Sequence, residues 1–507
     1  MQRDRAIAKI GWLGVAKHQG IGPVPDPEPR QRSPLLLITP NAFAWLMLLL
    51  WPLVVLVLYR RLPADKALIW AVLGGYLLLP PGIALNLPLV PDLGKDSIPV
   101  LMAAAMAVLV LRDRVSLLPQ NPLGRVLMAL FVLSPFATVL TNGDAMARGP
   151  GVIQGMRLYD SVAAVANQAI ALLPFFLGRR YLAGPDAMRH MLVALMAAGL
   201  AYSVPMLIEV RLSPQMNAWI YGYFQHDFSQ TMRFGGFRPV VFLPHGLWVA
   251  FFAMMALIAA LTLARASPKD RRPKLVFATL YLAAVLVLCK SAGPLVYAVG
   301  LSLLILVMPR RGQVIVAAAL AVMVVSYPLL RGAQLIPIEA IVEFAKGLSP
   351  DRASSLQFRI TNEEALLDRA NLKAWFGWGG YGRNLIYDPL TGAGLSIADG
   401  AWIITMGIYG WLGYIAQFGL LALPLLLMGR RALLRRGEEI SAYAAAVCLI
   451  LAANLVDMLP NATLIPFTWL MAGAVLGHAE GRVQGWAGQT PAPGRAARLP
   501  KPRRTVL

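Results

Sequence analysis

The chain has 507 residues, of which 58% are hydrophobic and only 14% are charged. A soluble domain carries about 25% charged residues, so this composition predicts a polytopic membrane protein rather than one large aqueous core. The formal net charge of +21 would suit a nucleic-acid partner in a soluble protein. Here the basic residues stand in short loops and near both ends, and no basic helix interleaves base-reading side chains. Nucleic acid is therefore not expected as a partner.

Residues 1–40 form a Pro- and Arg-containing lead, which we expect to be a mobile tail. The first apolar run begins near Asn41, too far in for a cleavable signal peptide, so we expect this helix to stay. About thirteen apolar runs follow, and several are shorter than the roughly 20 residues that a span needs, which predicts about 11–13 transmembrane helices. The runs are 41–58, 67–85, 98–111, 125–140, 161–177, 191–208, 239–264, 275–289, 293–308, 313–330, 402–428, 441–459 and 462–477.

Basic loops orient most of these runs, because Lys and Arg concentrate in cytoplasmic loops. If the spans alternate, the basic positions fall on one side together with the C-terminal tail. They are Arg112, Arg114, Arg125, Arg179, Arg180, Arg265, Lys269, Arg271, Arg272, Lys274, Arg310, Arg311, Arg430, Arg431, Arg435 and Arg436. The segments 86–97, 209–238 and 331–400 then lie outside. The beginning stays open, because the basic residues over 60–66 and the basic lead both favour the inside.

This pattern predicts five parts of the chain. They are a mobile tail over 1–40, transmembrane helices over 41–330 with a short outer loop at 209–238, a large outer loop over 331–400, C-terminal transmembrane helices over 401–477, and a basic cytoplasmic tail over 478–507.

A short polar segment carries two arginines beside a span that begins near Pro239. Arg233 and Arg238 flank two glycines in the run Arg-Phe-Gly-Gly-Phe-Arg. Glycines let the backbone approach a ligand closely, and each guanidinium offers a planar donor fork that matches phosphate oxygens. The arginines therefore either bind a substrate phosphate or pair with lipid headgroups.

Two more polar residues interrupt apolar runs on the same side. His245 is predicted one or two turns inside a span, where a lone histidine either serves a partner or makes a packing hydrogen bond. Lys290 either snorkels to headgroups or adds a third cation to a diphosphate site. Cys289 and Cys448 lie in apolar runs and indicate neither a disulfide framework nor a zinc site. No metal and no nucleotide cofactor is expected.

The polar segment 331–400 is the most informative part of the sequence. Ser354 to Gln357 matches a capping box, which predicts an amphipathic helix to about Trp375, lying on the outer surface or over a site. Its expected apolar side holds Phe358, Leu366, Leu367, Ala370 and Trp375, and its expected polar side holds Arg359, Glu363, Arg369 and Lys373. Glu363 and Glu364 either act as bases or belong to a solvated face.

Aromatic residues between glycines follow this helix. Trp375, Trp378 and Tyr381 either stack on the apolar faces of sugar rings or form an interfacial aromatic belt. Asp399, immediately before a span, either accepts a proton from a sugar hydroxyl or caps the helix. Asp457 is a functional candidate within a span, or it faces water near the outer end.

In this order, these positions resemble the O-antigen ligase and polysaccharide polymerase (Wzy-type) superfamily of bacterial inner membranes. The similarity runs from Leu79 to about Pro466 and rests on four places. They are Arg233-Phe-Gly-Gly before a span, Lys290-Ser-Ala-Gly-Pro at the end of another, the helix from Arg359 to Trp375 with Gly377, Gly379 and Gly382, and Asp399-Gly400 before Gly407-Ile-Tyr-Gly-Trp-Leu-Gly413.

The resemblance implies a GT-C-like helical architecture, glycosyl transfer on the periplasmic side, and an undecaprenyl-diphosphate-linked oligosaccharide as the donor. It implies that Arg233 or Arg238, with Lys290 and Arg359, holds the leaving diphosphate without a metal. Ligase-type members usually have histidine where Asp399 stands, which weakens a ligase assignment. Asp399 would then be the base, with His245 as the other candidate.

Three activities fit this sequence. The first is a polymerase that joins lipid-linked repeat units of an exopolysaccharide or O-antigen, with other polysaccharide assembly proteins as partners. The second is a ligase that moves a finished glycan to a lipid or protein acceptor. The third is a flippase for the same lipid, which should line its central spans with charge over their full depth; the candidate charges here gather at one face instead.

Overall fold

The computed structural model describes residues 39–86, 91–113, 115–116, 118–233, 235–348, 350–434 and 439–481. The predicted mobility of the first tail and the predicted side of the last one concern residues that lie almost entirely outside these ranges. The same is true of Arg114, Arg435 and Arg436.

The described chain is mainly helical, with three short antiparallel hairpins. Its helices are α2 (Ala42–Arg61), α3 (Ala64–Leu78), α4 (Ile98–Leu109), α5 (Pro122–Leu140), α6 (Leu158–Tyr181), α7 (Pro185–Leu212), α8 (Met216–Tyr221), η1 (Phe228–Thr231), α9 (Gly246–Ala266), α10 (Arg272–Leu288), α11 (Ala292–Val307), α12 (Arg310–Gly332), α13 (Ile338–Leu348), α14 (Pro350–Asn371), α15 (Ala401–Leu434), α16 (Ala442–Asp457) and α17 (Pro466–Ala479). Its strands are β1 (Ala84–Leu85), β2 (Leu93–Gly94), β3 (Met146–Arg148), β4 (Gly151–Ile153), β5 (Met232–Arg233) and β6 (Gly236–Phe237).

Seven described helices are long and apolar enough to cross a membrane, namely α2, α5, α6, α7, α9, α12 and α15. Three shorter helices, α4, α11 and α16, are also apolar. The prediction of a helical, multi-pass membrane protein is confirmed at this level, because a span needs about 20 apolar residues. The larger count of 11–13 spans stays a prediction.

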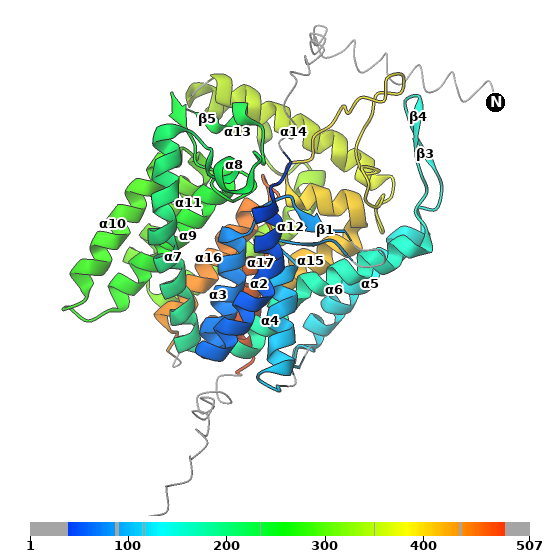
Figure 1. Cartoon of the computed structure of the whole chain (residues 1–507). Coiled ribbons are helices and arrows are strands. Elements are labelled where there is room, and N and C mark those ends of the chain that lie inside the picture. The colour runs from blue at the N-terminus through cyan, green and yellow to red at the C-terminus, as the bar shows by residue number, and fades with distance from the viewer. Residues whose placement is uncertain are drawn as a thin grey trace, which may run out of the picture. The chain divides into compact units, whose positions relative to one another are not determined.

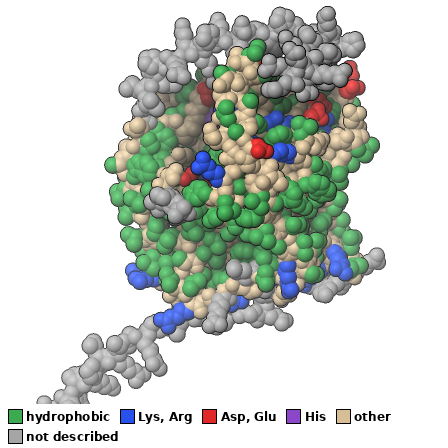
Figure 2. Space-filling model, turned by 90° about the vertical axis from the view of Figure 1, so that its right-hand side faces the viewer, with side chains coloured by type: hydrophobic (Ala, Val, Ile, Leu, Met, Phe, Trp, Pro, Cys, Tyr) green, Lys and Arg blue, Asp and Glu red, His purple; other side chains and the backbone are tan. Residues whose placement is uncertain are grey.

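The helices run back and forth, so their ends gather at two opposite ends of the bundle (Figure 1). The end that we call the polar end holds the described residues of the segments 79–97, 141–157, 213–245, 333–400 and 458–465. The end that we call the basic end holds the short connections at 62–63, 110–121, 182–184, 267–271, 308–309 and 439–441, within their described residues. A broad hydrophobic band lies between a rim of basic side chains and a zone of mixed charge (Figure 2).

The open question about the beginning of the chain has a structural answer. α2 continues through Pro52 without interruption, so the run forms one helix that is long enough to cross a membrane. Its first residues lie at the polar end, where the Asn41 amide donates to the carbonyl of Ile220 over 2.9 Å. Arg60 and Arg61, in its last turn, consequently lie at the basic end with the other basic loops.

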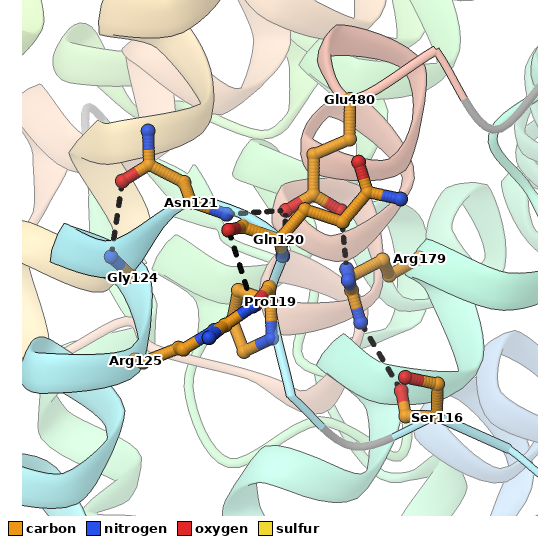
Figure 3. A network of polar contacts seen from close by, with 8 residues as sticks. All are labelled: Ser116, Pro119, Gln120, Asn121, Gly124, Arg125, Arg179 and Glu480. Atoms are coloured by element: carbon orange, nitrogen blue, oxygen red, sulfur yellow. Dashed lines mark hydrogen bonds and ion pairs between the residues drawn. The ribbon is translucent and has the colours of Figure 1, made fainter.

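A buried ion pair fastens the basic end (Figure 3). The carboxylate of Glu480 accepts from Nε of Arg179 at 2.7 Å and from the backbone N–H groups of Gln120 and Asn121 at 2.6 and 3.3 Å. Nη1 of Arg179 donates to the carbonyl of Ser116 at 3.1 Å. The residue after α17 thus holds the α4–α5 connection and the end of α6 together.

α6 and α17 pack backbone to backbone through glycines. A Cβ at Gly178 would overlap the carbonyl oxygen of Leu470, and a Cβ at Gly473 would overlap that of Phe175. Small residues at such a crossing let apolar helices approach closely in lipid, where dispersion contacts rather than the hydrophobic effect drive association.

The polar end contains structure that the all-α prediction missed. β1–β2, β3–β4 and β5–β6 are antiparallel hairpins with strands of two or three residues. Strands this short give no alternation of polar and apolar residues from which to recognise them.

The amphipathic helix differs from its prediction in both boundaries. α14 begins at Pro350, a favoured first position because proline has no N–H to leave unpaired, so Ser354 lies inside the helix and the predicted capping box is wrong. The helix ends at Asn371 rather than near Trp375. Leu366, Leu367 and Ala370 are buried as expected, whereas Phe358 and Trp375 are exposed.

The start of α15 turns sharply at Gly410, whose φ of 66° and ψ of −163° are open only to glycine. The bend lets the N–H of Trp411 donate to the carbonyl of Ala374 at 2.8 Å. A Cβ at Gly410 would overlap the backbone of Ala374 and Trp375. α15 and the end of segment 331–400 therefore fold as one unit.

We expect Gly410→Ala to lower the free energy of unfolding by roughly 1–3 kcal/mol, through backbone strain and this overlap. The matched control is Gly300→Ala in α11, where no atom lies within 4 Å of the new Cβ and where alanine favours helix by roughly 0.5–1 kcal/mol. Thermal unfolding in detergent measures both. Equal effects of the two substitutions would contradict the assigned role of Gly410.

Candidate functional site at the polar end

Four cationic side chains from distant parts of the chain lie at the polar end. Arg233 comes from β5, Arg238 follows β6, Lys290 lies between α10 and α11, and Arg359 lies on α14. We call these four the cationic cluster. A Cβ at Gly246, the neighbour of His245, would overlap the side chain of Arg238. After the larger effect of burial, the charges of Arg238, Arg233 and Arg359 each lower the pKa of His245.

The β5–β6 hairpin positions two members of the cluster. Arg233 pairs with Gly236 across it, and the N–H of Arg238 donates to the carbonyl of Thr231 at 2.8 Å. A Cβ at Gly236 would overlap the ammonium group of Lys290. The missing side chain of Gly236 therefore leaves room for a third cation beside the two arginines. Close approach of this kind is what glycines at a ligand-binding site allow.

Arg238 is the most deeply placed cation of the cluster, with 5% of its surface exposed. Burial, and then the neighbouring charge of Arg233, lowers the pKa of its guanidinium to about 10, so it still carries its charge at neutral pH. Its buried Nε has no hydrogen-bond partner among the described residues. A buried, charged donor without an acceptor is costly, and an anionic ligand would remove that cost.

The backbone between the hairpin and α9 is rigidly held. The carboxylate of Glu209 accepts from the N–H groups of Val240 and Val241 at 2.7 and 2.8 Å. Nζ of Lys95 donates to the carbonyl of Phe242 at 2.5 Å. These bonds replace the helical bonds that the apolar run was expected to make, so α9 starts at Gly246 rather than near Pro239.

His245 is consequently not inside a helix, and that prediction is wrong. It is the N-cap of α9, and its Nδ1 accepts from the N–H of Leu247 at 2.9 Å. Burial first, and then the charge of Arg238, lowers the pKa of His245 to about 3. The ring is therefore neutral with its proton on Nε2, which suits a hydrogen-bond donor rather than a general base.

Asp399 faces Arg359 in an ion pair, with 3.5 Å between Oδ2 and Nε. Both side chains are nearly half exposed, and such pairs contribute only about 0–1 kcal/mol. An incoming anion can therefore compete for Arg359 at little cost. The prediction that Asp399 is the base stays open, since its carboxylate is engaged with a cation in this arrangement.

Glu363 is a second carboxylate at this place, one that the sequence left as an alternative. It lies one turn after Arg359 on α14, and it is half buried. Burial raises the pKa of Glu363 to about 7, against the weaker opposing effects of the Trp402 indole, Arg331 and Arg359. A carboxyl group that titrates near neutral pH is suited to proton transfer.

We expect Glu363→Gln to remove the acidic limb of the pH–rate profile. Because the pKa of Glu363 is raised to about 7, its basic form is lost as pH falls below 7, so wild-type turnover should rise with pH through that value. The substitution should slow turnover by about 10²-fold. Glu364→Gln is the matched control, since that neighbour is half exposed and bonds Arg331. An unchanged acidic limb in Glu363→Gln would exclude the role.

The predicted sugar-binding aromatics lie elsewhere. Trp378 packs under Arg369 and Lys373, with 4.2 and 4.9 Å from each cation to the ring centre, and its Nε1 donates to the carbonyl of Arg369. Arg369 is about 15 Å along α14 from Arg359. Trp375 and Tyr381 are exposed, and Tyr381 reaches Asp160 of α6 at 3.4 Å. No described contact joins these aromatics to the cationic cluster.

A cavity of about 540 Å³ lies beside the segment that leads into α9. Its wall includes Pro244, the neighbour of His245, and three aromatic residues from different helices. Those aromatics are Tyr76 of α3, Trp248 of α9 and Trp469 of α17. Asp96 lines the same cavity, and its residue is exposed. Sequence patterns do not reveal this site, because its walls come from five separate segments.

Asp457 is buried. The alternative expectation, that it faces water near the outer end of its span, is therefore wrong. Its carboxylate accepts from Asn461 at 3.0 Å and from Thr463 at 2.7 Å. Asn454 accepts from the hydroxyl of Thr468 at 2.8 Å. The pair therefore joins α16 to the connection that leads into α17.

No protein-family model matches this chain, and no curated protein is similar to it at the level searched. Within the described residues, no three or more His, Cys, Asp and Glu side chains gather into a candidate metal site. The cationic cluster is the chemically distinctive feature of the polar end.

Proposed function

We propose that this chain is a membrane glycosyltransferase that takes an undecaprenyl-diphosphate-linked oligosaccharide as its donor at the polar end. The observation that carries the proposal is the cationic cluster, above all Arg238, which is buried, charged and lacking an acceptor at Nε within the described residues. A diphosphate supplies negative charge and acceptor oxygens together, and arginine forks match them.

The reaction that suits this arrangement is substitution at the anomeric carbon. An acceptor hydroxyl oxygen forms the new bond to that carbon, while the bond from the carbon to the diphosphate oxygen breaks. Negative charge grows on the departing diphosphate, where Arg233, Arg238, Lys290 and Arg359 stabilise it. Arg238 is buried, so little reorganisation of that group accompanies the step.

The hydroxyl proton requires an acceptor, and Glu363 is the stronger candidate. The pKa of Glu363 lies near 7, whereas Asp399 is occupied with Arg359. We propose that Asp399 positions Arg359 until the donor displaces it. His245 would donate from Nε2 to a ligand oxygen, because its Nδ1 is bound by the backbone.

The aromatic cavity beside Pro244 offers a place for a carbohydrate ring. Tyr76, Trp248 and Trp469 line it, and aromatic side chains are suited to contact the C–H groups of sugars. The carboxylate of Asp96 accepts hydrogen bonds from hydroxyl groups. We therefore propose this cavity, instead of Trp375, Trp378 and Tyr381, as the sugar-binding part of the site.

Charge distribution supports the proposed orientation. Basic loops favour the cytoplasm, so the basic end would face the cytoplasm and the polar end the periplasm of a bacterial inner membrane. The donor lipid would then present its diphosphate at the outer surface of the bundle, where the large segment 331–400 and the cationic cluster lie.

Polymerisation of repeat units is the preferred activity, and ligation of a finished glycan is the alternative. Transport of the lipid is less well supported. The long described spans α9, α12 and α15 carry their charged residues only near their ends, whereas a path for a diphosphate needs polar groups across the full depth.

Purified protein in detergent with a labelled undecaprenyl-diphosphate oligosaccharide tests the proposal. A ladder of products with released undecaprenyl diphosphate is expected for a polymerase, and a single transfer to an added acceptor for a ligase. Arg238→Gln serves as the inactive control. Intact donor in every reaction, together with movement of that donor across liposome membranes, would overturn the enzyme proposal in favour of a flippase.

A further inference from the structure

A basic cavity of about 520 Å³ lies at the basic end, far from the cationic cluster. It is bounded by the ends of α9 and α11, the first turn of α12 and the residues that lead into α16. Three arginines line it, Arg265, Arg310 and Arg311, and one carboxylate, Glu439. The lining charge is therefore positive on balance.

The cavity is built from fixed groups. Nη1 of Arg265 donates to the carbonyls of Ile305 and Leu306, in the last turn of α11. Nη1 of Arg310 donates to the carbonyl of Ile440 at 3.4 Å, and the buried amide of Gln313 donates to the carbonyl of Met308 at 3.0 Å. The guanidinium groups are thus held in place by backbone carbonyls.

The first turn of α12 adds to the positive potential. Its N-cap is Pro309, whose side chain makes no capping hydrogen bond. The positive end of the helix dipole favours an anion at the helix start. The three arginines and this helix start face the same cavity.

A second, mostly apolar groove shares Arg265 with the cavity as a lining residue. This groove, also about 520 Å³, is lined by Arg265 and Arg272 and otherwise by Leu261, Ala264, Val276, Thr279, Leu280 and Leu306. Val276, Leu280 and Leu306 are exposed apolar side chains. A cationic cavity and an apolar groove on either side of one arginine match an amphiphile with an anionic head.

We infer that this site binds an anionic phospholipid, with the phosphate in the cavity between Arg265 and Arg310 and an acyl chain in the groove. Basic pockets between membrane helices at a basic face are suited to such headgroups. A soluble phosphate would leave the groove unexplained, and a zwitterionic lipid would leave the excess positive charge unexplained. This inference does not depend on the proposed glycosyl transfer.

Thermal unfolding of the full-length protein in detergent tests the site, with dioleoyl phosphatidylglycerol, dioleoyl phosphatidylcholine and glycerol 3-phosphate as separate additions. Only phosphatidylglycerol is expected to raise the melting temperature strongly, because a ligand stabilises the state that binds it. Native mass spectrometry should show the same lipid retained. Equal effects of the two lipids, or an equal effect of glycerol 3-phosphate, would overturn the inference.

Variants locate the site. The double substitution Arg265→Gln and Arg310→Gln should raise the half-saturating phosphatidylglycerol concentration about tenfold. Arg271→Gln is the control, since that arginine is at the same end but highly exposed and paired with Asp270. Val276→Trp should fill the groove and weaken binding without touching an arginine, which keeps the test decisive if the double variant does not fold. Equal weakening by Arg271→Gln would point to diffuse charge and overturn the site.

Discussion

Replacing Arg238 with glutamine is expected to lower product formation by about 10²–10³-fold while leaving the protein folded. Removing one fixed donor from a developing negative charge typically costs about 3–4 kcal/mol of transition-state stabilisation. Arg238 is the best placed for this role, because its Nε is buried and has no acceptor among the described residues. Initial rates with the labelled donor at saturating concentration measure the effect.

Stability separates this role from a structural one. A buried guanidinium that lacks an acceptor is costly in the free protein, so Arg238→Gln should leave the melting temperature unchanged or raise it. Arg238→Lys should retain part of the activity, because it keeps the charge and loses the fork. The matched control is Arg211→Gln, an exposed arginine in the last turn of α7. Wild-type activity in Arg238→Gln would remove this residue from the site.

Arg179→Met should lower the free energy of unfolding by about 3–5 kcal/mol, the cost of leaving a buried charge without its partner. Its guanidinium and the carboxylate of Glu480 are 0% and 4% exposed, with 2.7 Å between them. Denaturation in detergent, followed by tryptophan fluorescence, measures the loss.

Two comparisons sharpen this result. Arg180→Met, next in the chain, breaks a pair with Asp113 that is partly exposed at 32% and 18%, so it should cost only about 1 kcal/mol. The double variant Arg179→Met with Glu480→Leu should recover part of the loss, because no charge is then left unpaired. If Arg179→Met lowered the free energy of unfolding no more than Arg180→Met does, the Arg179–Glu480 ion pair would not be what stabilises the basic end.

The sequence was sufficient to place these four cations at the polar end, whereas their role as phosphate ligands stays a prediction. Arg233, Arg238 and Lys290 each stand near an apolar run, and Arg359 lies in the polar segment 331–400, all on the side opposite the basic loops. Alternation of spans then forces them to one end, whatever the details of packing. The helical, multi-pass architecture was predictable from the composition, because long apolar runs predict membrane-spanning helices.

Local geometry was less predictable. The run after Pro239 is apolar and reads as helix, yet its backbone bonds the carboxylate of Glu209, thirty or more residues earlier. That contact moves the start of α9 to Gly246 and places His245 at its cap. Pro244, directly before the cap, was the one local signal of this boundary.

The role of Trp378 also depended on tertiary contacts. Glycine-spaced aromatics fit both a sugar site and a packed turn, and only the stacking of Trp378 with Arg369 and Lys373 distinguishes the two. The suitability of Glu363 for proton transfer was also not predictable from the sequence. It depends on a pKa raised by burial, and the spacing of residues along a helix does not reveal burial.

The fastening of α17 to α6 has a consequence for biosynthesis. The ribosome synthesises α6 long before α17. The glycine face around Gly178 therefore has no α17 to pack against while the ten α-helices from α7 to α16 are made. During that interval the Arg179 side chain has no Glu480 to neutralise it. Chains interrupted before α17 would therefore leave α6 without this partner and would be natural targets for membrane quality-control proteases, whereas arrival of α17 completes the contact.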